Sequence, residues 1–562
     1  MSIKETGVFP LSPFQQIVWL QQHLAPDGRA YHASAVLEFR GDMDAAMLRK
    51  CIGDAVGRHD AMRIRICDDG STVARQEVVE GLHVEIPEHD LRGAENIEER
   101  RAALLHQHVN AEFDLRIAPL VRWALVRLAD RHWQLFVTEH HLVHDGRSII
   151  VFFDDVLRQY SAEVAGKRLT ADITPSYEDY VRYTASPEHR KIVDADVEWW
   201  KAELDGAKFG IEFAGLGSRR SGLFDFRGGQ YRQALPAGLM DRVRAVARQS
   251  GHTVFAALLA VYAEICRRYS GQHDLVIGLP LANRPPEFER TVGMMVNAVP
   301  LRLAVDPGVP CSEVALKTTI AVSDAIDHES APIQDLVRAL NSSSKGLSNP
   351  LFNTLFGMHD ALCPTVEVPG VSVDMQAPLS ANSTKFDLSV IVLPDKAVHS
   401  DSGDRSYELV WEYSHQMFSA EDVQLLATGF AAILREYVAH PAEPIGSLAL
   451  AAVAPSERDE HEAPRSADVV KPSAGTGGPA AEDGGEPFSS LWLTAFRDVL
   501  GRDDVNSATD FFRAGGYSLL VPELLSRYAS LSGWRPPIRW VFEFSSPAEL
   551  EAATKARRPD AV

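Results

Sequence analysis

The chain has 562 residues, more than one hydrophobic core usually supports, so we expect at least two domains. Its composition, 45% hydrophobic and 24% charged, is that of a folded globular protein and excludes disorder as the main state. The formal net charge of −21 argues against nucleic acid or an anionic membrane as a partner, because both favour clustered lysine and arginine.

Targeting signals are not evident in the sequence. The first residues lack the basic start and apolar core of a signal peptide, and no apolar run reaches the ~18 residues of a membrane span. The most apolar helical segment, residues 252–266, contains His, Thr and Glu and is predicted to be a buried core helix. Five scattered cysteines without a Cys-x-x-Cys pair indicate reduced thiols, as in a cytoplasmic protein.

A strand followed by a helix is predicted around residue 140. Residues 133–138 are rich in aromatic and β-branched side chains, which favours a strand. Apolar residues then recur with helical spacing at Ile149, Ile150, Phe153, Val156, Leu157 and Tyr160. The stretch 140–146, His-His-Leu-Val-His-Asp-Gly, therefore lies at a strand-to-helix turn, where side chains can project from a rigid scaffold.

A linker separates the last part of the chain. Residues 451–486 are rich in Pro, Gly, Ala and acidic residues and poor in large apolar ones, which predicts a flexible connection. Residues 487–562 show the pattern of a small helical domain. One helix is predicted with an apolar face of Leu491, Leu493, Phe496, Val499 and Leu500, and a second from Ser518 to Leu525.

The turn at 140–146 carries residues suited to acyl transfer. Adjacent strand residues point to opposite faces, so His140 and His141 cannot both line one cavity. A neutral imidazole, with an ordinary pKa near ~6.5, can accept a proton from an attacking amine or alcohol. Asp145 and Gly146 predict a tight turn that an arginine can pin. A metal site formed with His144 is disfavoured because the two adjacent histidines diverge.

Seven ordered motifs resemble those of condensation domains from nonribosomal peptide synthetases, and together they span nearly all of residues 1–450. The central one is His140-His141-x-x-x-Asp145-Gly146. The others are residues 11–16 with Trp19, residues 58–63, residues 177–180, residues 283–285 continued by 292–297, residues 333–335, and residues 348–352.

The resemblance implies an α/β (α+β) fold. It comprises two lobes, each like chloramphenicol acetyltransferase, in a V-shaped arrangement, with one lobe at about 1–175 and the other at about 176–450. In that family the second histidine, here His141, is the active one, and whether it is a base or positions the nucleophile is left open. His140 is then structural, Asp145 pairs with an arginine that maps to Arg284, and Gly146 borders the reacting carbonyl.

The end of the chain resembles a peptidyl carrier protein, a small four-helix bundle. The motif is Asp510-Phe511-Phe512-Arg513-Ala514-Gly515-Gly516-Tyr517-Ser518-Leu519-Leu520. It implies that Ser518 carries covalent 4′-phosphopantetheine, attached by a phosphopantetheinyl transferase. The alternative is that Ser518 is an ordinary helix N-cap.

Departures from the family limit the partners and the reaction. The intact histidine pair argues against heterocyclisation, and a carrier placed second argues against epimerisation. His144 replaces a small or apolar residue and either tunes the acceptor side or simply packs. No adenylation domain fits between the two parts, so we expect an upstream donor carrier, and an adenylation or other loading enzyme, to act in trans on a monomeric protein.

The function expected from these features is amide formation between a carrier-bound acyl donor and an amine. Ester formation with an alcohol acceptor uses the same residues and stays open. A non-catalytic platform that recruits trans-acting enzymes to the carrier is the alternative from another class.

Overall fold

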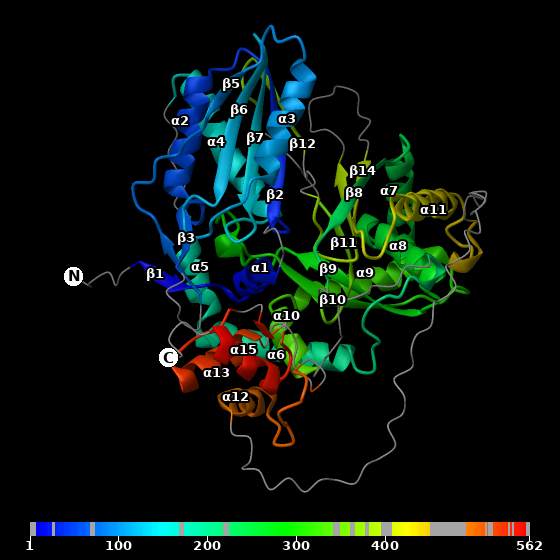
Figure 1. Cartoon of the computed structure of the whole chain (residues 1–562). Coiled ribbons are helices and arrows are strands. Elements are labelled where there is room, and N and C mark those ends of the chain that lie inside the picture. Colours follow the sequence, from blue (N-terminus) through cyan, green and yellow to red (C-terminus); the bar gives the residue numbers. More distant parts are fainter. Residues whose placement is uncertain are drawn as a thin grey trace, which may run out of the picture.

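The computed structural model describes residues 7–24, 29–67, 74–167, 174–216, 224–340, 349–359, 366–376, 382–394, 407–449, 490–511, 514, 521–537, 540–541 and 544–557. Two β-sheets with covering helices and a small third sheet account for the described residues up to 449, and separate helices follow from residue 490 (Figure 1). This mixed α/β architecture confirms the predicted fold class for the large part of the chain.

The first lobe is built on a five-stranded sheet in the order β12-β2-β7-β6-β5, with a three-stranded sheet β1-β4-β3 beside it. Neighbouring strands of the five-stranded sheet are antiparallel, except that β5 and β6 are parallel. The elements are β1 (Val8–Pro10), α1 (Pro13–Leu24), β2 (His32–Gly41), α2 (Ala45–Arg58), η1 (Asp60–Arg63), β3 (Ile64–Cys67), β4 (Arg75–Val78), β5 (Glu88–Asp90), α3 (Ile97–Asn110), β6 (Val121–Ala129), β7 (His132–His140) and α4 (Gly146–Val164).

Strand β7 and helix α4 confirm the strand and helix predicted on either side of residues 140–146. Alternate residues of β7 face different sides of the sheet. Leu135 and Val137 pack in one core with Phe152 of α4, whereas Phe136 packs in another with residues of α3. Figure 1 shows α3 and α4 on opposite faces of this sheet. The strand therefore delivers neighbouring residues into two different environments.

The second lobe has a six-stranded sheet in the order β10-β9-β11-β13-β14-β8. Its elements are α5 (Tyr177–Thr184), α6 (Pro187–Glu203), η2 (Ala214–Leu216), β8 (Gly228–Ala234), α7 (Leu239–Ser250), α8 (Val254–Ser270), β9 (Asp274–Leu281), η3 (Pro286–Phe288), β10 (Asn297–Ala304), α9 (Cys311–Asp327), α10 (Ile333–Ala339), β11 (Thr354–Met358), β13 (Leu388–Pro394), β14 (Tyr407–Ser414), α11 (Ala420–Ala439) and η4 (Ile445–Ser447). Helix α8, predicted as a core helix, is buried from Ala256 to Cys266.

The two lobes share chain segments. Strand β12 (Val371–Gln376) comes from the second half of the sequence but pairs antiparallel with β2 of the first sheet. The hydrophobic core of the first lobe also takes in Tyr177, Phe288 and Met295. Segments numbered near 290 are thereby packed against the start of α4, where the candidate site lies.

The C-terminal helices are α12 (Leu491–Leu500), α13 (Val521–Ser532) and α15 (Pro547–Arg557), which share a small apolar core. The predicted apolar face of the first of these is wrong at one position. Leu491 is 43% exposed, and Trp492 is fully buried instead, stacked on Tyr528 at 3.8 Å. The larger indole fills the core, and Leu493 and Phe496 complete the buried face. Residues 450–489 lie outside the described residues.

Within the described residues, no helix is long and apolar enough to cross a membrane.

Candidate functional site

The two adjacent histidines occupy different environments. His140 is the last residue of β7 and has no solvent exposure. Its ring lies 6.0 Å from His32 and 6.1 Å from Phe113, and its Nε2 has no hydrogen-bond partner among the described residues. His141 is the first residue after the strand and is partly exposed, and its backbone N–H donates to the Tyr31 carbonyl at 2.8 Å. Only His141 is thus available to a substrate.

Three neighbours hold the His141 ring. Its Nδ1 is 3.3 Å from the sulfur of Met294, Tyr31 meets it edge-on at 6.1 Å, and the His144 ring stacks against it at 5.3 Å with an interplanar angle of 18°. Because Nδ1 faces Met294, Nε2 is the nitrogen left to meet a substrate. Burial lowers the pKa of His141 well below its usual value, and the charges of Lys385, His144 and His140 lower it further. The imidazole is therefore neutral at neutral pH.

Asp145 ties the turn to helix α4. It is the N-cap of α4 and accepts from the backbone N–H and the hydroxyl of Ser148 at 2.8 and 2.7 Å. It also accepts from the Met295 N–H at 3.0 Å and from Nη2 of Arg284 at 2.9 and 3.1 Å. Burial raises the pKa of Asp145, but Arg284 and the hydrogen bonds outweigh burial, so the net pKa lies below its usual value.

Arg284 connects the two lobes at this point. Its side chain is 2% exposed, and its Nη1 donates to the carbonyls of Phe288, at 3.1 Å, and Thr291. Ser148 adds a second connection, since its hydroxyl contacts both the carbonyl and the N–H of Gly293, at 2.8 and 3.0 Å. The Asp145–Arg284 pairing was predicted from the family resemblance, whereas the part of Ser148 was not.

Other motifs of the sequence surround the same turn. The Gln15 amide donates to the Leu142 carbonyl at 2.7 Å. Asp60 accepts from the Tyr177 N–H at 2.8 Å, and the Tyr177 hydroxyl donates to the Met294 carbonyl at 2.7 Å. The motifs at 11–16, 58–63 and 177–180 therefore support the segment that carries His141 and the segment that contacts it.

Two residues that the sequence did not single out also border the turn. A Cβ added at Gly146 would lie 2.7 Å from Cε1 of His359, so any larger residue there would require the His359 ring to shift. The ammonium of Lys385 lies 5.4 Å from the centre of the Tyr31 ring, and burial lowers its pKa. Neither residue stands in a motif with a sequence pattern that would have revealed it.

The remaining predicted residues are placed as follows. Ser518 lies outside the described residues. Arg147, which directly follows the predicted turn in the sequence, is exposed and pairs with Glu289. In the part of the chain that the structure describes, no group of three His, Cys, Asp or Glu side chains is arranged to hold a metal ion.

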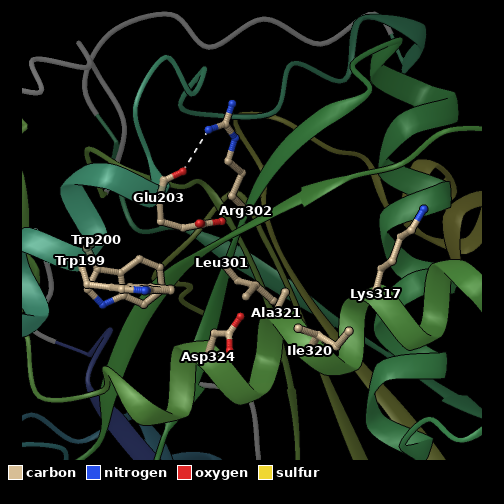
Figure 2. A pocket seen from close by; sticks show the side chains of 9 residues that line it. All are labelled: Trp199, Trp200, Glu203, Leu301, Arg302, Lys317, Ile320, Ala321 and Asp324. Carbon is tan, nitrogen blue, oxygen red and sulfur yellow. Dashed lines mark hydrogen bonds between the residues drawn. The ribbon is translucent and has the colours of Figure 1, made fainter.

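A pocket in the second lobe is separate from these residues. It lies among α6, β10 and α9 and has a volume of about 140 Å³, with Trp199, Arg302 and Asp324 in its wall (Figure 2). Ligand sites usually enclose ~300–1,000 Å³. None of the site residues lines the pocket, so it is not the reaction site.

Comparison with known proteins identifies relatives of the first 450 residues. A family model described as "Condensation domain" matches residues 5–458. The chain is 29% identical over 451 residues to phosphinothricin tripeptide synthetase PhsC of Streptomyces viridochromogenes, covering 79% of this chain and 40% of the relative. It is 28% identical over 443 residues to surfactin synthase subunit 1 of Bacillus subtilis, covering 79% of this chain and 12% of the relative. The chain therefore spans less than half of the length of each of these relatives.

Solved structures share the fold. The starter condensation domain of rhizomide synthetase RzmA aligns with a TM-score of 0.69 at 20% identity, covering 79% of this chain and 98% of that chain. The first condensation domain of the calcium-dependent antibiotic synthetase aligns with a TM-score of 0.67 at 23% identity, covering 79% and 99%. The X-domain from teicoplanin biosynthesis, in complex with OxyB, aligns with a TM-score of 0.65 at 22% identity, covering 80% of this chain and 97% of that chain. The chain belongs to the condensation domain family, the acyltransferase-type domains that form amide bonds in nonribosomal peptide assembly lines.

Proposed function

We propose that this chain transfers an acyl group from a carrier-bound thioester to an amine, and that His141 contacts the attacking amine. The observation that carries the proposal is the state of the His141 ring. It is held on three sides, kept neutral, and left with Nε2 for a substrate. A neutral imidazole accepts a hydrogen bond from an amine, whereas an imidazolium cannot.

The reaction requires one proton to move. The amine nitrogen attacks the thioester carbonyl, the C–N bond forms, the C–S bond breaks, and a proton passes from nitrogen to the departing thiolate. The low pKa of His141 makes it a weak base in the ground state. Its contribution then lies in orienting the amine and in accepting the proton as positive charge develops on nitrogen.

The same proposal extends to the C-terminal helices as a tethered carrier. Ser518 receives 4′-phosphopantetheine from a phosphopantetheinyl transferase and presents the amine, while the donor arrives on an upstream carrier loaded by an adenylation or other enzyme in trans. In support, Ala514 donates its N–H to the Asp510 carbonyl at 3.0 Å and α13 begins at Val521, so Ser518 is flanked in sequence by a turn and a helix.

The carrier assignment is tested on the intact protein by mass spectrometry. After incubation with coenzyme A and a promiscuous phosphopantetheinyl transferase, the chain should gain one phosphopantetheine, and Ser518→Ala should gain none. Absence of the added mass in the unchanged protein would remove the carrier from the proposal.

The catalytic assignment is tested with His141→Ala. Loss of general acid–base and positioning help costs ~10²–10⁴-fold in rate. We expect amide formation from pre-loaded carriers to fall within that range, with carrier binding unchanged. The exposed His440→Ala is the matched control, because that side chain is 58% exposed and far along the sequence in the second lobe. Full activity of His141→Ala refutes the assignment.

The choice of acceptor is tested by assaying amines and alcohols in parallel. Product formed only from the alcohol would replace amide by ester formation. Absence of either product, with carrier binding retained, would favour a recruitment platform.

A further inference from the structure

A fully buried carboxylate lies directly behind the candidate site. Glu139 is the next-to-last residue of β7 and has no solvent exposure. By strand alternation it shares the face of Leu135 and Val137, which belong to the large apolar core of the first lobe. A charge at such a position is costly unless a partner compensates it.

The partner of Glu139 is His144. Its Nδ1 lies 2.8 Å from Oε2 of Glu139, and its side chain is 4% exposed. Within the described part of the chain, neither carboxylate oxygen of Glu139 nor Nδ1 of His144 makes a well-aligned hydrogen bond, so their 2.8 Å contact is the compensation that the carboxylate receives. Removing one partner of such a buried contact is costly, because the other group is left without compensation.

His144 in turn contacts the active ring. The two imidazoles lie nearly parallel, with centres 5.3 Å apart and an interplanar angle of 18°. If His141 also took up a proton, two like charges would face each other at that distance. The other groups near His141 are His140, Tyr31 and Lys385, and a charge on Lys385 also disfavours a proton on His141.

We propose that the buried contact between Glu139 and His144 holds the His141 ring in place and keeps it unprotonated, and that both are positioning residues for acyl transfer. The inference rests on the proposed role of His141. Under this inference His144 influences the protonation of His141 rather than simply packing against it. Glu139, which belongs to none of the sequence motifs, supports His144 in that role.

The expected size of the effect follows from the ring separation. Two unit charges 5.3 Å apart at an effective dielectric constant near 20 change a titration midpoint by about two pH units. The opposite charge of the Glu139 carboxylate should offset part of this change. Removing the charge on His144 should therefore raise the His141 midpoint by about one pH unit.

The test titrates His141 in the full chain labelled with ¹³C at histidine Cε1. The resonance of His141 is assigned by its loss in His141→Ala. In Glu139→Gln and in His144→Phe, which keeps an aromatic ring in the stack, we expect the midpoint to rise by about one unit. The acidic limb of the pH–rate profile for amide formation should move with it, because the titration of the acceptor amine is the same in every variant.

Two controls keep the result interpretable. Asp196→Asn changes a comparable carboxylate–histidine contact, the 3.1 Å pair with His328 in the second lobe, and should leave the His141 midpoint unchanged. The double variant Glu139→Leu/His144→Phe replaces the pair by apolar groups, a change that buried pairs tolerate. It should stay folded and show the raised midpoint. An unchanged midpoint in all three site variants overturns the proposal even if His141→Ala is inactive. Full activity of His141→Ala removes the proposed function instead.

Discussion

Replacing Arg284 by methionine is the most direct perturbation of the candidate site. The guanidinium is 2% exposed and pairs with Asp145, whose side chain is 3% exposed, at 2.9 Å. Methionine fills much of the same volume without a charge, so the substitution removes the interaction and leaves the Asp145 carboxylate buried. The carbonyls of Phe288 and Thr291 also lose a donor.

The expected cost follows from these contacts. Removing one partner of a buried ion pair typically destabilises a protein by about 3–5 kcal/mol, because the other charge is left without compensation. Asp145 keeps its hydrogen bonds from Ser148 and Met295, which favours the lower half of that range. We expect Arg284→Met to lower the free energy of unfolding by about 3 kcal/mol. For a cooperative unit of 150–250 residues this corresponds to a fall of roughly 6–12 °C in Tm.

The assay is equilibrium unfolding in urea, combined with amide formation measured below the transition. Arg284→Met should lose activity beyond its loss of stability, because the link between α4 and the segment at 284–295 sets the position of Met294 against His141. The double variant Asp145→Leu/Arg284→Met should recover part of the stability but not the activity. A cost below about 1 kcal/mol with normal activity would show that the pair neither stabilises the turn nor positions it.

Two further predictions concern neighbouring residues. Gly146→Ala should reduce amide formation strongly while leaving the fold in place, because its Cβ would press on His359, and Gly146→Ala/His359→Ala should restore part of the activity if the clash is the cause. Acid should destabilise the first lobe below about pH 6.5. Burial, aided by the charge of Arg122, lowers the pKa of His108 to about 4, and burial also lowers that of His140, so the unfolded state binds protons that the folded state does not. The free energy of unfolding should thus rise as the pH rises from about 4 to 6.5. The variant His108→Gln should show a smaller rise over this range. Urea titrations at several pH values measure the rise, and the same rise in the variant would contradict the assigned role of His108.

The elements next to the site were predictable because their local signals are strong. Aromatic and β-branched side chains along residues 133–138 indicated β7, helical spacing from Ile149 to Tyr160 indicated α4, and the turn between them follows. The pairing of Asp145 with Arg284 came from the family resemblance, because no local pattern relates residues 139 positions apart.

What could not be predicted depends on contacts formed only in three dimensions. Glu139 breaks the apolar alternation of its strand, and by pattern alone it indicates the end of the core rather than a buried carboxylate. Its partner comes five positions later, after the chain has turned. Leu491 was expected on the apolar face and Trp492 was not singled out, because helical spacing alone does not say which of two adjacent apolar residues fits the space next to Tyr528.

The candidate site combines a rigid support with a charged surrounding. The turn is fixed by the Asp145–Arg284 ion pair and by the hydrogen bond from Arg284 to Ser148. Because the two charges of the ion pair compensate each other, this part of the site positions His141 but has little electrostatic effect on its charge. Burial, Lys385 and His144 act differently, since each disfavours a positive charge on His141. A ring kept neutral in this way is a poor general base at rest but accepts a hydrogen bond over a wide pH range. That distinction bears on the question of base or positioning residue. If the surrounding charges set the state of His141, relaxing them should make the imidazole more basic and slow the reaction at mildly acidic pH. Above the new midpoint a general base should then react faster, whereas a positioning residue should keep its original rate.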